Sequence, residues 1–372
     1  MKRSPLRSCL KTPSGLRAAA KAPVSVGQPH PYLADTGGFS RLDRHFFARA
    51  RELTGNFKTA SIGFLLLSLL STAGQTDAQN TSRYGGDPLL LGAGARPLGM
   101  GSAFVAISDD ATAVYWNPAG LARLSRREVQ VQHAEQFGGT VNHDVFTLAG
   151  PSSAGGFGIG LLRLGVDGIK LTALEDPSAP LGPDNRPLVS QVVGTTDVTL
   201  TLAYGRKARS TLSLGLGLKF IWRDLSAGSG SGYGIDLGAL YTPRPDLSAG
   251  LTLRNLTRTR ISFDSGAADR IPPSLLLGVA YTRMIPVLRG RITWSTSVHI
   301  GEEKSGLEDI EGLHTGAEYR FQDKLAFRIG AEGDHFTAGA GIHLYGRFGF
   351  DLAFLEHGQL DNTYRISAFA YF

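Results

Sequence analysis

The sequence has almost no cysteine. Its 372 residues include one, Cys9, so disulfides, thiolate metal sites and cysteine catalysis are excluded for the rest of the chain. Complete motifs for other chemistry are missing too: there is no Gly-x-Ser-x-Gly elbow and no His-Glu-x-x-His pair. Glycine pairs such as Gly215/Gly217 and Gly339/Gly341 are typical of strands rather than of a nucleotide-binding loop. We therefore expect no enzymatic activity, no cofactor and no metal.

An excess of charge of one sign is also missing from most of the chain. Residues 1–78 carry 11 Lys/Arg and 4 Asp/Glu; of the totals of 38 and 32, this leaves 27 basic and 28 acidic residues, a net charge of −1. The formal charge of +6 thus belongs to the N-terminal segment, and no nucleic-acid partner is indicated. The mean hydropathy of −0.04 excludes a helical membrane protein, but it fits a barrel whose strands are half apolar.

What the sequence does have is strict alternation. Every second residue is apolar between 212 and 222, and again between 233 and 241 after a Gly/Ser loop. Side chains on a strand point to opposite faces in turn, so each stretch has one apolar face. That face is about as long as a tilted strand needs to cross a bilayer, and aromatic residues lie near its ends. A soluble β-sandwich would alternate as well, but it rarely repeats this pattern so many times.

The alternation predicts fourteen strands. They are expected at 128–137, 142–149, 156–166, 197–205, 211–222, 232–241, 247–255, 274–282, 291–300, 312–321, 324–332, 336–345, 347–355 and 363–372. The first three have mixed phases, which indicates bulges or misplaced boundaries. An even number suits a bacterial barrel with both ends on one side. We predict an all-β transmembrane protein: an antiparallel barrel over residues 127–372, surrounded by lipid in the outer membrane of a Gram-negative bacterium.

The predicted connections between strands fall into a long group and a short group. The odd connections include the long segments 167–196, 223–231, 256–273, 301–311 and 356–362, whereas most of the even connections are short. Outer-membrane barrels have short periplasmic turns and longer external loops. The odd connections should therefore face outwards, and the Pro-rich loop around Asp176 to Pro187, within the connection 167–196, should be the largest surface loop.

The N-terminal segment reads as a leader. Residues 1–57 are basic and lack periodicity, and residues 58–78 combine Lys58, an apolar run and a small-residue end typical of a Sec signal peptide. We expect cleavage after Ala78, or alternatively after Ala73. Because this signal begins far into the chain, the natural start is expected near residues 53–58, with an unusually long leader as the alternative.

Residues 79–126 differ in amino-acid composition from the predicted strands. They are rich in glycine and other small residues, and Asp109 and Asp110 are suitable N-cap residues for a short helix through Tyr115. The Asn117-Pro118 step should end that helix. Such a compact segment ahead of the strands predicts a hatch inside the barrel. Capping explains the two aspartates better than catalysis, because neither a histidine nor a metal cluster adjoins them.

This segment resembles the N-terminal signature of PorV/PorQ-type outer-membrane proteins, part of the wider group similar to the fatty acid transporter FadL. The matching elements lie between Leu98 and Leu121: Gly99, Met100 and Gly101; Asp109 and Asp110; and Trp116, Asn117, Pro118 and Gly120. The resemblance implies a 14-stranded barrel filled by its hatch and a role in type IX secretion. There the protein would bind cargo C-terminal domains and secretion components, with 167–196 and 256–273 as docking loops. The alternative is a FadL-like channel for hydrophobic molecules.

Two further sets of residues follow from the strand phases. Charged residues on the small or polar faces should line the lumen, because charge facing lipid costs several kcal/mol. They are Lys219, Asp236, Arg254, Glu318, Arg320, Arg328, Glu332, Asp351 and Arg365. We expect a structural role, with binding of a ligand head group as the alternative. The last strand, with Tyr364, Ile366 and Phe372, resembles the signal read by the barrel-insertion machinery.

Overall fold

The computed structural model describes residues 86–136, 138–226, 228–301, 312–358 and 361–372. The expected extension 1–57 and signal peptide 58–78 lie outside the described residues, and so do residues 79–85 of the expected hatch. In the described part of the chain, no helix is long and apolar enough to cross a membrane.

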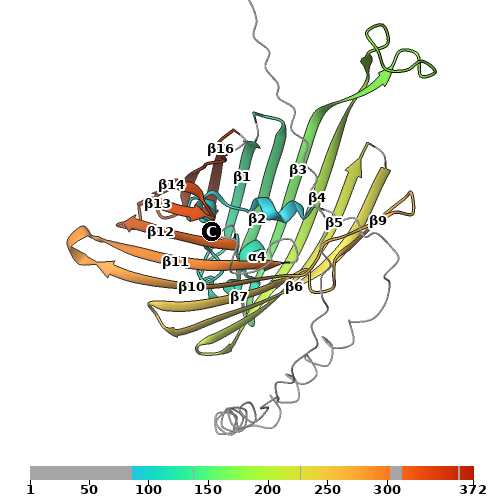
Figure 1. Ribbon diagram of the computed structural model, residues 1–372. Helices are drawn as coiled ribbons and strands as arrows, with labels where there is room; N and C mark the ends of the chain where they lie inside the picture. The colour runs from blue at the N-terminus through green and yellow to red at the C-terminus, as the bar shows by residue number, and fades with distance from the viewer. Residues whose placement is uncertain (1–85, 137, 227, 302–311, 359–360) are drawn as a thin grey trace, which may run out of the picture. The chain divides into compact units, whose positions relative to one another are not determined.

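Within the described residues, fourteen long antiparallel strands form a closed barrel (Figure 1). They are β1 (Glu128–Gln136), β2 (Val141–Ser152), β3 (Gly155–Leu174), β4 (Pro187–Arg209), β5 (Leu212–Leu225), β6 (Gly228–Arg244), β7 (Leu247–Arg254), β10 (Ser274–Ile285), β11 (Gly290–Gly301), β12 (Leu313–Phe321), β13 (Leu325–Glu332), β14 (His335–Leu344), β15 (Phe348–Leu355) and β16 (Thr363–Tyr371). Strand β1 pairs with β16 and closes the ring. The predicted barrel is confirmed, and each predicted strand overlaps an observed one.

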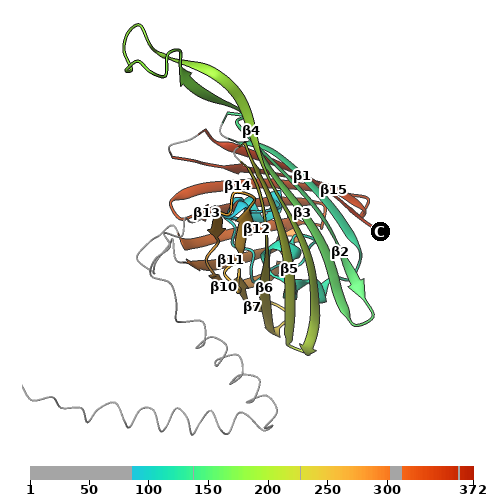
Figure 2. The ribbon, with the colours of Figure 1, turned by 90° about the vertical axis from the view of Figure 1, so that its right-hand side faces the viewer.

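The connection predicted at 167–196 is too long, although its Pro-rich loop around Asp176 to Pro187 lies where the strands are joined. Strands β3 and β4 continue past the barrel as a paired hairpin that projects from its rim, and only residues 175–186 connect them (Figures 1 and 2). Two register shifts interrupt this pairing, between Val166 and Ile169 and between Leu171 and Thr172. These shifts break the period of two, which is why the sequence showed no strand there.

The segment 256–273 also contains strands that were not predicted. Strand β8 (Arg260–Phe263) pairs with the outer part of β6, and β9 (Ala268–Arg270) pairs with β8. With four and three residues, they are too short for alternation to identify. Of the first three strands, β1 and β2 pair in one continuous register, whereas β3 has the two register shifts. The boundaries of β2 and β3 also differ from the predicted ones, since both strands are longer.

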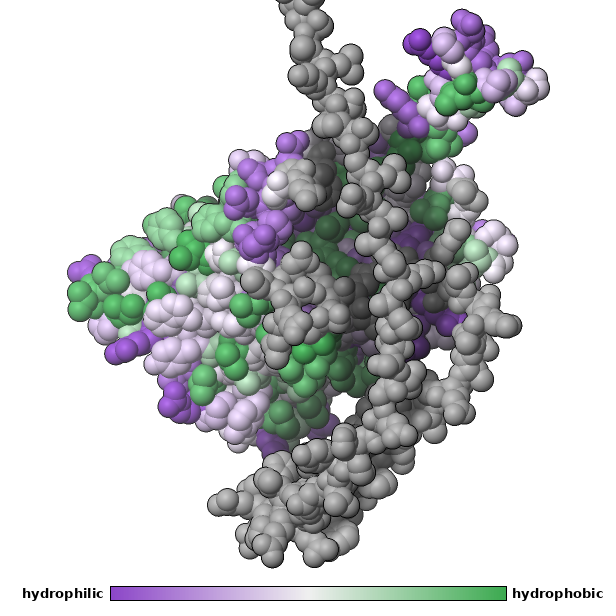
Figure 3. Space-filling model, viewed as in Figure 1, coloured by the Kyte–Doolittle hydropathy of each residue, from purple (hydrophilic) through white to green (hydrophobic). Residues whose placement is uncertain are grey.

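The apolar phase of the strands faces outwards. On β5, Leu214 is 48% and Trp222 is 47% exposed, whereas the intervening Lys219 is 1% exposed. Figure 3 shows hydrophobic residues over the barrel wall and hydrophilic ones towards the tip of the β3–β4 hairpin. This inverted pattern, with charge inside and apolar side chains outside, is the one that lipid requires.

The hatch lies in the lumen. It consists of the short helices η1 (Pro88–Leu91), α3 (Ala95–Leu98), α4 (Ala113–Trp116) and η2 (Pro118–Arg123), joined by buried turns. Its core is apolar and includes Met100 and Phe104, which pack with Ala280 and Ala353 of the wall. The hatch and the inner face of the barrel thus share one core.

The predicted N-cap is wrong in detail. Helix α4 has Thr112 as its N-cap, and the Thr112 side chain makes no capping hydrogen bond. The Asp110 carboxylate instead accepts hydrogen bonds from the Thr112 backbone N–H and hydroxyl. It forms a local turn before the helix, which satisfies a carboxylate equally well.

Candidate functional site

The Gly99-Met100-Gly101 element lies directly against the strand backbone. Gly101 has φ +62°, and a Cβ there would lie 2.4 Å from the Ala331 carbonyl oxygen on β13. Its N–H donates to Thr337 Oγ1 at 3.0 Å. Only glycine combines a left-handed backbone with such a close approach. This element therefore fixes one end of the hatch against β12–β14.

Arg96 joins this end of the hatch to the wall by charge. Its guanidinium donates to Glu318 on β12 through Nε at 2.9 Å and Nη2 at 3.1 Å. Nη1 donates to Asp109 at 2.6 Å and to Asp110 at 2.9 Å. Arg96 is not among the residues predicted from the sequence; the signal that could have identified it is an isolated arginine within a segment of small and apolar residues.

The carboxylates around Arg96 set its protonation. Burial alone lowers the pKa of Arg96, but Asp109, Glu318 and Asp110 together raise that pKa well above its usual value. Burial raises the pKa of Asp110, and the opposing effect of Arg96 does not cancel this. Arg96 is therefore a permanent cation in the lumen, whereas Asp110 takes up a proton more readily than an ordinary aspartate does.

Glu318 extends the network along the wall. It accepts from Arg328 at 2.7 Å and from Arg320 at 3.0 Å, and Arg328 donates to Asp351 on β15 at 2.7 Å. The sequence predicted all four as lumen-facing, and the structure places them together on neighbouring strands as one buried chain of charge.

The remaining predicted charges also lie inside the barrel. Lys219 pairs with Asp236 at 2.9 Å and donates to Asn255 at 2.7 Å. Arg254 donates to the Tyr115 carbonyl at 3.2 Å and lies over the Tyr115 ring, 4.5 Å from its centroid.

Glu332 and Arg365 also contact the hatch. Glu332 accepts from the Ser102 hydroxyl at 2.9 Å, and Arg365 donates to the Leu91 carbonyl at 3.2 Å. All nine predicted charges thus lie in the interior, each with a polar partner on the hatch or the wall.

The other end of the hatch motif rests on Asn117. Its Nδ2 donates to the Val105 carbonyl at 2.9 Å and to the Ala239 carbonyl of β6 at 3.1 Å. Its Oδ1 accepts from the Ala119 N–H at 3.1 Å. One fully buried amide therefore closes a hatch turn and attaches it to the wall.

The flanking residues of this element are also packed tightly. Trp116 donates from its indole N–H to the Ala93 carbonyl at 2.8 Å. The Pro118–Gly120 segment lies against β5, so closely that a Cβ on Gly215 would be 2.2 Å from the Ala119 nitrogen.

A cavity of about 210 Å³ lies above the hatch, at the end of the barrel with the long connections. Leucines Leu90, Leu91 and Leu98 of the hatch form its apolar part, together with Leu355. Its polar lining comes from strand ends and their connections, namely Gln136, Glu332, His335, Thr337, Glu356, His357 and Arg365. The site is amphipathic and lies on the side that barrel topology assigns to the cell exterior.

Two donors in this cavity lack acceptors among the described residues. They are the Nε2 of Gln136 and the Nε of Arg365, and both side chains are almost fully buried. The acidic groups nearby are already engaged: Glu332 accepts from Ser102, and Glu356 accepts from the Phe336 N–H. These two buried donors are therefore available to an acceptor that enters the cavity.

A second cavity, of about 180 Å³, lies at the end with the short turns. Its lining is strongly charged and includes Arg96, Asp109, Arg123, Arg291 and Glu318. The hatch separates the two cavities, with leucines on one side and the Arg96 network on the other.

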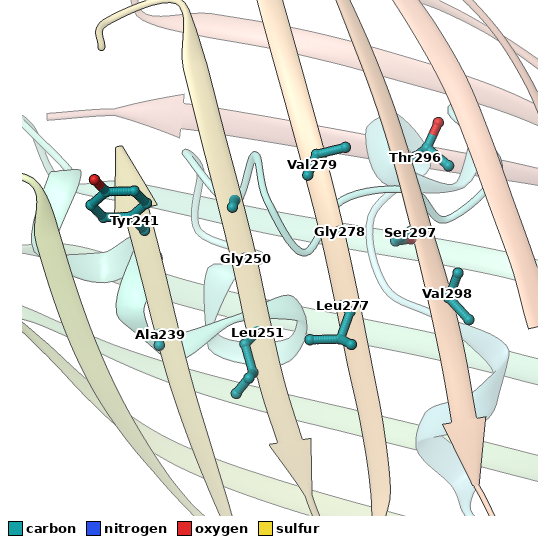
Figure 4. Close-up of a pocket in the computed structure, with 11 residues that line it drawn as sticks. Ala239, Tyr241, Gly250, Leu251, Leu277, Gly278, Val279, Thr296, Ser297 and Val298 are labelled. Atoms are coloured by element: carbon teal, nitrogen blue, oxygen red, sulfur yellow. The ribbon is translucent and has the colours of Figure 1, made fainter. Parts of the chain in front are cut away.

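The outer surface carries a shallow apolar depression of about 520 Å³ across β6, β7, β10 and β11. Figure 4 shows Tyr241, Leu251 and Leu277 around Gly250 and Gly278. A Cβ on Gly250 would lie 2.2 Å from the Val105 carbonyl, so only strand backbone separates this depression from the hatch. The depression faces lipid, and its apolar lining suits that environment.

The C-terminal residues lie on the outer face. Tyr364, Ile366 and Phe372 are exposed there, and β16 alternates them with buried Arg365 and Ser367. Their recognition by the insertion machinery stays a prediction.

Comparisons with known proteins concern part of the chain or the fold alone. A model of an uncharacterised protein family, UPF0164, matches residues 67–235, less than half of the chain. No curated protein matches the sequence. The PorV/PorQ assignment therefore stays a prediction.

Solved structures of membrane channels are similar in fold. The CymD monoaromatic hydrocarbon channel is 14% identical, with a TM-score of 0.49 over 76% of this chain and 98% of that chain. The Pseudomonas putida toluene transporter TodX is 15% identical, with a TM-score of 0.49 over 78% and 99%. A Pseudomonas aeruginosa FadL homologue is 14% identical, with a TM-score of 0.44 over 73% and 97%. These similarities concern the fold alone.

Proposed function

We propose that this barrel is an outer-membrane channel that takes up small hydrophobic molecules with a hydrogen-bond acceptor at one end, such as long-chain carboxylates. The observation that carries the proposal is the amphipathic cavity above the hatch, with unsatisfied donors on Gln136 and Arg365. A carboxylate accepts from both donors, and the leucines bury the start of the alkyl chain.

The hatch must move for such a molecule to pass. The Arg96 network lies between the two cavities, and its ion pairs hold the hatch against β12. Passage then requires these pairs to separate while the charged lower cavity hydrates them. Binding at the upper cavity and movement of the hatch are separate steps, which can be measured separately.

Binding is tested by calorimetry on the detergent-solubilised barrel, with a long-chain fatty acid and an alkane of equal length. The wild type should bind the acid and not the alkane. Gln136→Leu removes one donor at nearly constant volume and should weaken acid binding by about 10- to 100-fold, because a hydrogen bond to a charged group contributes about 1.5–3 kcal/mol.

Gln191→Leu, the same substitution on the exposed hairpin, is the control and should bind as the wild type does. Equal affinity for acid and alkane would refute the head-group site. Unchanged uptake of the acid by cells that lack the protein would refute the channel.

A second function is supported by the β3–β4 hairpin. It projects from the rim and carries exposed apolar residues on both of its faces, among them Leu171, Leu188, Val189 and Val192. A two-stranded ribbon also leaves both edges unpaired, which suits addition of a partner strand. This surface fits the docking of a cargo domain expected for a PorV-type protein in type IX secretion.

Replacing residues 169–193 by a short turn tests this second function. The barrel should still fold, since these residues lie outside it, while secreted proteins with the cargo domain should disappear from the cell surface. An unchanged secretome in that strain would exclude the docking role and leave the channel proposal untouched.

A further inference from the structure

The outer face near the long-connection end carries an ordered row of side chains across four strands. In the strand register Phe220 of β5 lies opposite Tyr233 of β6, Tyr233 opposite Arg260 of β8, and Arg260 opposite Arg270 of β9. Residues directly opposite in adjacent strands share a face. This face is the outer one, because the neighbouring Ile221 and Ile261 point inwards and are buried.

Two like charges meet in this row. Arg260 and Arg270 are both exposed, and neither forms an ion pair with another described residue. The nearest acid on β9, Asp269, points inwards and pairs with Arg223 at 3.3 Å. Like charges directly opposite destabilise a strand pair, so this arrangement favours an anion between them.

The surroundings fit an anion that carries apolar chains. A cavity of about 600 Å³ is lined by Arg260 and Arg258, and Arg270 lies opposite Arg260 on β9. Phe220 and Trp222 stack on the wall of this cavity with ring centroids 6.4 Å apart. Serine hydroxyls from Ser231 and Ser262 also line it. Towards the middle of the barrel, the same face continues with Leu218 and Ile235. The donors thus lie level with an aromatic band, and apolar residues follow towards the middle of the barrel, as at a membrane interface.

We propose that Arg260 and Arg270 bind the phosphate-bearing head group of an outer-leaflet lipid, whose acyl chains lie along β5 and β6. The site is on the outer wall and is distinct from the cavity above the hatch. It ties the irregular β8–β9 hairpin to the membrane surface, because the bound phosphate neutralises the two opposed arginines.

Native mass spectrometry of the full chain in detergent tests the site. The probes are phosphatidic acid and diacylglycerol with identical acyl chains, which differ only in the phosphate. The wild type should retain phosphatidic acid in preference, and Arg260→Gln/Arg270→Gln should lose about 30-fold of that preference, from about 1 kcal/mol for each arginine near an anionic lipid surface.

The control is Arg206→Gln/Arg283→Gln, which removes two outward-facing arginines at the opposite end of the barrel. It should keep the preference. Equal retention of phosphatidic acid by the Arg260/Arg270 variant and the wild type would overturn the site. Full displacement of the lipid by inorganic phosphate would reduce it to a simple anion site without a lipid role.

Discussion

The two ends of the hatch are attached to the barrel wall by different kinds of interaction. The Gly-Met-Gly end is attached to β12–β15 through buried ion pairs centred on Arg96 and Glu318. The Asn-Pro end is attached to β5 and β6 through neutral hydrogen bonds of Asn117 and through backbone packed on glycine. Charge pairs can be exchanged for water when a cavity adjoins them, whereas close-packed backbone cannot. If the hatch moves as the channel proposal requires, the Arg96 end is the one expected to release and the Asn117 end is the anchor.

The largest expected effect comes from the charged end. Glu318→Gln leaves Arg96, Arg320 and Arg328 without their shared anion and should destabilise the folded barrel by about 3–5 kcal/mol, as loss of one partner of a buried ion pair does. Denaturant unfolding in detergent measures this. Glu332→Gln, which removes a partly exposed charge bonded to Ser102, is the control and should cost far less. If Glu318→Gln and Glu332→Gln lowered the free energy of unfolding equally, the buried network would contribute no more to stability than a partly exposed charge does.

Asn117→Ala tests the anchor. The substitution removes the Asn117 donor from the carbonyl oxygens of Val105 and Ala239. It should lower the free energy of unfolding by about 1–3 kcal/mol for each buried carbonyl that stays unsatisfied. Proteolysis of the hatch in the folded barrel should become faster. If Asn117→Ala instead opened the hatch to ligand as readily as Glu318→Gln, the distinction between anchor and release end would fail.

A steric change sharpens the same comparison. Gly215→Ala places a methyl group against the Ala119 nitrogen and the Pro118 backbone and should cost about 1–3 kcal/mol, as overpacking does. Gly217→Ala lies two residues along the same inner face, where a Cβ would contact only side-chain atoms at 3.5 Å or more. Gly217→Ala should therefore leave the melting temperature unchanged. An equal decrease in the melting temperature of both variants would show that the loss comes from the strand itself and not from the contact with the hatch.

The smallest effect is a pH dependence. Because burial raises the pKa of Asp110, the folded protein binds this proton more readily than the unfolded chain does. The linked stability is fully present below the unfolded pKa of about 3.9 and is lost as the pH rises through the folded pKa. Asp110→Asn should therefore show a smaller loss of stability across this window than the wild type. Parallel curves of stability against pH for the two proteins would contradict the assignment.

Alternation was sufficient to predict the fourteen wall strands because lipid and lumen impose opposite chemistry on successive residues. Alternation did not predict the β3–β4 extension, because this hairpin projects beyond the barrel and has no lipid-facing and lumen-facing sides. Its two register shifts also interrupt the period of two. The hatch partners could not be predicted either. Arg96 and Glu318 are 222 residues apart, and nothing in the sequence specifies which strand meets the hatch.

Gln136 shows how a site residue escapes notice. On β1 it follows Gln130 and Gln132 on the inner face, so it resembled one more polar lining residue. Only the structure shows that its amide reaches a cavity and finds no acceptor among the described residues. A missing partner cannot be recognised until all of its neighbours are known.

The seam between β1 and β16 has a consequence for assembly. The last strand supplies Ser367, which accepts from the Ala95 N–H, and Arg365, which donates to the Leu91 carbonyl. The plug therefore completes its bonds only when the final segment of the chain arrives. We therefore expect the hatch to enter the lumen before, or together with, closure of the β1–β16 seam during membrane insertion.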